Sequence, residues 1–116
     1  MTSAPESNGP AHHGLAQMTK FEVVVRGEDV SAVEEVFAAT GVSGFTGVSG
    51  VSGLGHDGYH QGRLLFNDQA VLSMLITVVP DELTDPLMTG LRALFEERSG
   101  VMFVSDVFVS RPEYFR

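Results

Sequence analysis

The stretch that decides the fold is AVLSMLITVVPDELTDPLMTGLRALFEERSGVMFVSDVFV, residues 70–109. Its opening residues are mostly β-branched and aliphatic, which is typical of a strand, and a proline ends that run. Residues 84–97 carry apolar side chains at helical spacing, so we predict a helix with Asp85 as its N-cap and Pro86 at its first position. A glycine stops this helix, and residues 101–109 return as a strand. The stretch therefore predicts a strand–helix–strand unit.

A similar unit precedes it. The run FEVVV at residues 21–25 predicts a strand, and Asp29 is placed to cap a helix that ends at the C-cap Gly41. Residues 42–53 are β-branched and glycine-rich, and residues 63–66 (RLLF) are predicted as a strand. The order strand, helix, strand, strand, helix, strand predicts an α+β protein with the ferredoxin-like βαββαβ topology. In that topology two right-handed crossovers lay both helices on one face of an antiparallel sheet.

The length of 116 residues corresponds to one domain. We expect residues 1–17, MTSAPESNGPAHHGLAQ, to be a disordered N-terminal arm, because they are polar and lack apolar periodicity. Residues 18–116 are then the folded domain. There is no apolar run of membrane-spanning length and no secretory signal pattern, so the expected compartment is the cytoplasm.

The charge balance restricts the classes of partner. Fifteen acidic residues against 7 basic ones give a net charge of −8. This argues against a sequence-independent nucleic-acid binder and against a polybasic membrane-surface module. The absence of cysteine excludes disulfides, thiolate metal sites and cysteine nucleophiles.

Glycine is concentrated in the middle of the chain. Eight of the 13 glycines lie between residues 41 and 62, and from Gly41 to Gly53 they recur at every third position. A period of three conflicts with the period of two in a strand. The pattern therefore indicates either crowding at a subunit interface or a backbone surface against which a ligand lies. Consecutive amides in the loop that follows could bind an anion without any basic side chain.

Metal and catalytic signals are weak. His56, Asp57 and His60 invite a metal hypothesis, but the glycines around them disfavour a helix. On a strand the two histidines would be about 13 Å apart, too far to chelate one ion. No nucleophile has a recognisable acid–base partner, so we predict neither a metal site nor an enzyme. Arg98 and Arg111 are candidates for binding phosphate or carboxylate, or else for a helix-dipole contact and a surface ion pair.

Four short motifs occur in an order that resembles the PII signalling proteins: GVSGFT at 41–46, VSGLG at 51–55, VVPD at 78–81 and GVMFVSDV at 100–107. The resemblance runs from about residue 18 to residue 109. The short central loop with its GHDGYHQGRLLFND continuation, together with the early C-terminus, is similar to the carboxysome-associated, bicarbonate-responsive PII-like branch.

The resemblance implies a homotrimer that binds adenine nucleotides in clefts between neighbouring subunits, with a central loop that engages a partner. It implies that the phosphates are lined by Gly53, Leu54, Gly55 and His56. Val78 would offer its backbone to the adenine, and Gly44, Phe45 and Thr46 would close over the base from the adjacent subunit. Gly100 would belong to a short phosphate-contacting loop. Arg98 and Arg111 are further candidates for nucleotide binding because arginine is a natural partner of phosphate. The arginines usual on the C-terminal segment of the family are not matched in register, with Arg111 only nearby. The candidates for binding bicarbonate are Gly58, Tyr59, His60 and Arg63.

The chain also departs from the family pattern. Val101 stands where a lysine usually follows the equivalent of Gly100, so we expect ADP or AMP to be preferred over ATP. Asp57 replaces a glutamine that serves 2-oxoglutarate, and an added carboxylate repels a dicarboxylate. Tyr59 is out of register with the usual modification site, so uridylylation is not expected.

These features predict a non-catalytic sensor of adenine nucleotide and bicarbonate that reports to a bicarbonate transporter or a carboxysome component. Binding of the two ligands would be positively coupled. The alternatives are a trimeric metal-binding protein similar to CutA and a small ferredoxin-like enzyme acting on an anionic metabolite.

Overall fold

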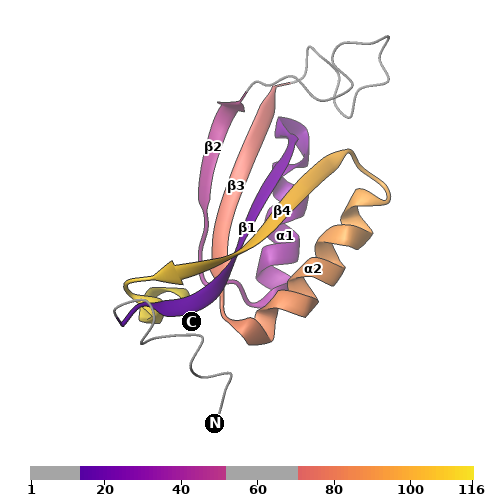
Figure 1. The fold of residues 1–116 in the computed structure, drawn as a ribbon. Coiled ribbons are helices and arrows are strands. Elements are labelled where there is room, and N and C mark those ends of the chain that lie inside the picture. The colour runs from indigo at the N-terminus through magenta and orange to yellow at the C-terminus, as the bar shows by residue number, and fades with distance from the viewer. Residues whose placement is uncertain (1–13, 52–70) are drawn as a thin grey trace.

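The computed structural model describes residues 14–51 and 71–116, which form a four-stranded antiparallel sheet with two helices on one face (Figure 1). The elements are β1 (Ala16–Arg26), the 3-10 turn η3 (Gly27–Asp29), α1 (Val30–Thr40), β2 (Thr46–Val51), β3 (Leu72–Val79), α2 (Asp81–Phe95), β4 (Gly100–Val109) and the 3-10 turn η4 (Pro112–Phe115). The strand order across the sheet is β2-β3-β1-β4, and all pairs are antiparallel. The predicted βαββαβ topology is confirmed.

The core lies between the sheet and the helices. Side chains alternate along β1 and β3, so every second residue is buried under α1 and α2. The buried core consists of Phe21, Val23, Val25, Val33, Phe37, Leu75, Val79, Leu87 and Leu91. Both helices therefore cover one face of the sheet, and in residues 14–51 and 71–116 no helix or strand covers the other.

Strand β1 begins earlier than the sequence predicts. Ala16 pairs with Val109, and Gln17 pairs with Phe108. These pairings extend the sheet two residues into the predicted arm, so the boundary at residue 18 needs correction. Residues 1–13 of the arm and the predicted strand at 63–66 lie outside the described residues.

The predicted bounds of the second helix are wrong. It runs from Asp81 to Phe95, its N-cap is Pro80, and Pro86 lies inside it. Asp81 and Glu82 occupy the first turn, where acidic side chains interact favourably with the helix dipole. Packing of an apolar face against the core offsets the one backbone hydrogen bond that Pro86 cannot donate.

Two of the periodic glycines have a positive φ, a backbone conformation that other residues rarely adopt. Gly41 is the C-cap of α1 with a φ of 96°, as predicted, and Gly50 has a φ of 72°. The register between β2 and β3 shifts between Ser49 and Val51, so Gly50 forms a β-bulge there. Two of the periodic glycines are thus explained by the local backbone.

Candidate functional site

One end of the sheet gathers the positions predicted to contact phosphate. Val51, at the end of β2, pairs with Leu72 at the start of β3, so the segment 52–70 leaves and rejoins the sheet at this end. Arg26 pairs with the same Leu72, and Gly100 pairs with Val25. The ends of β1 and β2 and the starts of β3 and β4 therefore lie at the same end of the sheet (Figure 1). We call this the phosphate end, defined by Val51, Leu72, Arg26 and Gly100.

Backbone hydrogen bonds and a close ring contact fix the turn between α2 and β4. The amide of Arg98 donates to the carbonyl of Leu94 at 3.1 Å, and the amide of Glu96 donates to that of Ala93 at 3.2 Å. A Cβ on Gly100 would collide with the ring of Phe95. Only glycine fits there without displacing that ring, so the approach to β4 is closely constrained.

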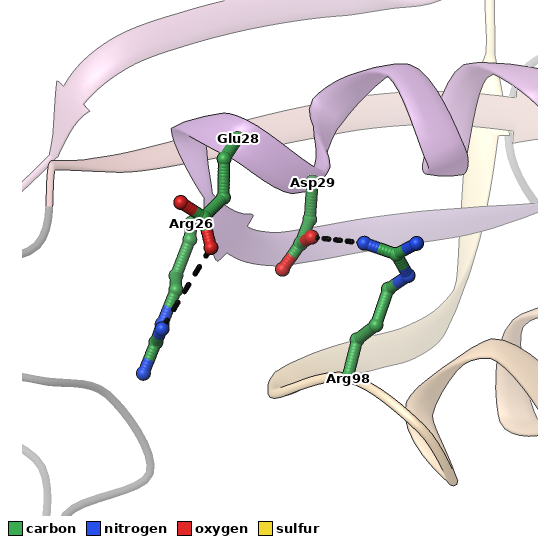
Figure 2. Close-up of polar contacts among 4 residues, drawn as sticks. All are labelled: Arg26, Glu28, Asp29 and Arg98. Carbon is green, nitrogen blue, oxygen red and sulfur yellow. Dashed lines mark hydrogen bonds and ion pairs between the residues drawn. The ribbon is translucent and has the colours of Figure 1, made fainter.

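A charged contact joins this turn to the start of α1. Arg98 Nη1 donates to Asp29 Oδ1 at 2.6 Å (Figure 2). The side chain of Asp29 is 6% exposed and that of Arg98 is 47% exposed. A buried carboxylate needs a partner of this kind, because its desolvation is otherwise costly.

The predicted side-chain cap by Asp29 is wrong. Asp29 occupies the N-cap position of α1, but its side chain makes no capping hydrogen bond. Its carboxylate bonds Arg98 instead, because a charged guanidinium is a stronger donor than a backbone amide. The contact of Arg98 with nucleotide stays a prediction, and nearly half of its side chain remains accessible.

The predicted base-binding residues lie on β3, at the start of β2 and in the segment that leads into β2. The carbonyl of Gly44 accepts a hydrogen bond from Thr77 Oγ1 at 2.6 Å, and Thr46 pairs with Ile76. Val78 follows Thr77 on β3, so it lies beside Gly44 within one chain. The implication that Gly44, Phe45 and Thr46 cover a base held on Val78 of the adjacent subunit stays a prediction.

Phe45 is partly exposed beside this segment. Its ring centroid lies 5.4 Å from that of Phe37 in a tilted arrangement, and 43% of the residue is exposed. The buried Phe37 thereby supports one side of the Phe45 ring. The accessible side remains free to meet a base.

The C-terminal segment places Arg111 near the predicted base-binding residues. Ser43 Oγ donates to the carbonyl of Tyr114 in a long contact of 3.5 Å, which places η4 beside the Gly44 segment. Arg111 Nη1 donates to the Tyr114 hydroxyl at 3.0 Å, and its guanidinium lies 5.6 Å from the ring centroid. Sequence reasoning missed Tyr114, although an aromatic residue three positions after a candidate arginine was a usable signal. We call Gly44, Phe45, Thr46, Val78 and Arg111 the base end.

The phosphate end and the base end are separated along the sheet. Leu72 marks the former on β3 and Val78 the latter, and six residues of strand span about 20 Å. One chain therefore does not bring both ends to a single nucleotide. A second chain with its phosphate end against this base end would complete the site.

The face of the sheet that the helices leave bare is largely apolar. Directly paired residues project to the same side, so the register assigns this face. Its apolar members are Val24, Val48, Met74, Ile76, Val78, Val101 and Phe103. Phe103 is 58% exposed, and Lys20 and Glu22 form an ion pair of 3.3 Å on the same face. We call this the open face; a contiguous apolar patch of this kind is typical of a subunit contact.

Within one chain, there is open space where Gly44 and Gly47 would carry a side chain. A Cβ on Gly44 would meet no atom within 4 Å, and one on Gly47 would meet only Phe45 Cε1 at 4.0 Å. Neither has a positive φ. Both the interface and the ligand interpretations of the glycine pattern stay open at these positions.

The remaining predicted ligands lie outside the described residues. For phosphate these are Gly53, Leu54, Gly55 and His56, and for bicarbonate Gly58, Tyr59, His60 and Arg63. Among residues 14–51 and 71–116 no three histidine, aspartate or glutamate side chains gather as metal ligands. In the same ranges no helix is both long and apolar enough to cross a membrane.

Comparisons with known proteins agree with the fold. The family described as nitrogen regulatory protein P-II matches residues 18–114. CPII from Thiomonas intermedia, a nitrogen regulatory PII-like protein bound to ADP, AMP and bicarbonate, is 39% identical, with 88% of this chain and 96% of that chain covered and a TM-score of 0.73. CPII bound to ADP, AMP and acetate is 36% identical with a TM-score of 0.76, covering 88% and 97% of the two chains.

A more distant similarity concerns the fold alone. GlnK from B. subtilis is 17% identical with a TM-score of 0.58, covering 79% of this chain and 86% of that one. No curated protein sequence matches the chain.

Proposed function

The chain belongs to the nitrogen regulatory protein P-II family, and on that premise we propose that it is a non-catalytic regulator that binds ADP or AMP, together with bicarbonate, between the subunits of a homotrimer. The observation that carries this proposal is the similarity to CPII, whose solved structure holds ADP, AMP and bicarbonate and covers 88% of this chain. We further propose that it acts in the cytoplasm on inorganic-carbon uptake or on carboxysome function.

The separation of the two ends supports a site between subunits. The base end and the phosphate end are about 20 Å apart along β3, so adenine and phosphates need contributions from two chains. PII proteins form trimers, and the open face offers the apolar surface that such an assembly would bury.

The charges at the phosphate end support a preference for the shorter nucleotides. Arg26 and Arg98 are the described arginines there, and each is already paired with an acid: Glu28 at 3.8 Å and Asp29 at 2.6 Å. Val101 supplies no charge where relatives usually have a lysine. The described residues at this end therefore carry little net positive charge to balance a triphosphate, and ATP is expected to bind more weakly than ADP.

The bicarbonate proposal rests on CPII and on the loop sequence, whose candidate ligands Gly58, Tyr59, His60 and Arg63 stay predictions. A nucleotide that orders this loop would raise the affinity for bicarbonate, and the coupling must be reciprocal. No observation on the described residues favours the CutA-like metal-binding alternative or the enzyme alternative.

Calorimetric titration of the purified protein with ADP, AMP and ATP, with and without saturating bicarbonate at fixed pH and ionic strength, tests the proposal. We expect ADP and AMP to bind more tightly than ATP, and ADP to bind more tightly in the presence of bicarbonate. Absence of ADP binding under both conditions would refute the nucleotide site. ADP binding that is unaffected by bicarbonate would refute the inorganic-carbon role and leave a nucleotide-responsive regulator.

A further inference from the structure

We propose that Asp29 is a positioning residue for nucleotide binding: it holds one part of the Arg98 guanidinium so that the remaining donors meet the terminal phosphate of ADP. The inference rests on the proposed function, because it needs a nucleotide at the phosphate end. Asp29 itself lies outside the motifs that carry the family resemblance.

The geometry of the pair supports a holding role. Asp29 lies in η3 and is almost completely buried, while Arg98 lies in the turn between α2 and β4. The 2.6 Å bond therefore joins two segments that are 69 residues apart in the sequence. Separating the buried carboxylate from its cationic partner would be costly, because it would leave an unpaired charge at that position.

The planar guanidinium of Arg98 can bond Asp29 and an anion at the same time. It carries five N–H donors in a fixed fork, and Nη1 is the donor to Asp29. The other terminal nitrogen points away from Asp29 (Figure 2), and 47% of the Arg98 side chain is exposed. A guanidinium held in this way loses little further conformational freedom when an anion binds, so the pairing raises affinity through preorganisation.

The position of the turn indicates which phosphate is contacted. Arg98 stands two residues before Gly100, at the phosphate end, so it would meet the phosphates of a nucleotide and not its base. The terminal phosphate is the part of ADP furthest from the base. AMP lacks that phosphate, so Asp29 should affect ADP binding and leave AMP binding unchanged.

The test compares ADP and AMP affinities by calorimetry for the wild-type protein and three variants. Asp29→Asn removes the holding charge, and Arg98→Lys keeps the positive charge but lacks a fork, so its ammonium stays with Asp29. Glu28→Gln is the matched control, because it removes the same charge one residue away, on a side chain that is 73% exposed and paired more loosely (Figure 2). Thermal unfolding without ligand shows whether each variant is folded.

We expect Asp29→Asn and Arg98→Lys each to weaken ADP binding about tenfold, the loss of one charge-assisted hydrogen bond. AMP affinity should stay within about twofold of wild type, and Glu28→Gln should weaken the binding of neither nucleotide. Equal weakening of ADP and AMP, or unchanged ADP binding in both variants, would overturn the proposal. If Asp29→Asn does not fold, Arg98→Lys decides by the same criterion. A wild-type protein that binds no ADP would instead refute the proposed function itself, before any variant is measured.

Discussion

Replacement of Gly100 by alanine should destabilise the protein, because the first residue of β4 lies against the ring of Phe95. A Cβ at residue 100 would collide with Cε1 of that ring and stand 2.8 Å from Cδ1 and 3.0 Å from Cζ. The ring or the strand has to move, and overpacking of this kind typically costs about 1–3 kcal/mol. At about 4–8 °C per kcal/mol for a small domain, Tm should fall by about 4–24 °C.

The assay is thermal unfolding followed by circular dichroism, at equal protein concentration because the stability of an oligomer depends on it. Gly47→Ala is the matched control, since the nearest atom to its Cβ would be Phe45 Cε1 at 4.0 Å. It should leave Tm unchanged or raise it slightly. Adding Phe95→Leu to Gly100→Ala should recover part of the loss. A Gly100→Ala protein as stable as wild type, or a double variant no better than the single one, would refute the reasoning.

Three further changes test other parts of the molecule. Thr77→Val removes the 2.6 Å hydrogen bond to the Gly44 carbonyl and should lower the free energy of unfolding, measured in urea, by about 1–2 kcal/mol. A variant that is as stable as wild type and binds ADP normally would contradict the assigned geometry. Phe103→Glu puts a charge on the open face and should shift the protein to smaller species in light scattering, whereas an unchanged mass would exclude this face from the interface. Pro86→Ala restores the amide donor to the Glu82 carbonyl and should raise Tm by a few degrees; a fall would show that the rigidity of proline contributes more.

The order of the elements could be predicted because it depends on local patterns. Runs of β-branched residues mark the strands, and Gly41 ends α1 through a left-handed conformation that glycine adopts readily. The N-cap of α2 was predicted five residues too late, at Asp85 instead of Pro80, because Pro86 is typical of a first turn. Pro80 is a stronger boundary, since two acidic residues follow it directly.

The site could be predicted only in part because its contacts are distant in sequence. Asp29 and Arg98 are 69 residues apart, so nothing local indicates that the capping position is occupied by an ion pair. The proximity of Gly44 to Val78 follows from the pairing of β2 with β3, which local patterns do not specify. The Asp29–Arg98 pair depends on burial, and the proximity of Gly44 to Val78 depends on strand register. Residue type alone indicates neither.

The pairing of Val51 with Leu72 has a consequence for how this protein can diverge. The two residues bracket segment 52–70 and are fixed opposite each other by the sheet, whatever chain is inserted between them. Doubling the length of a flexible insertion at such a point costs only about 0.6 kcal/mol in closure entropy. Natural variants can therefore exchange this segment while retaining the same scaffold. The same junction is a suitable place to graft a reporter peptide or a small domain.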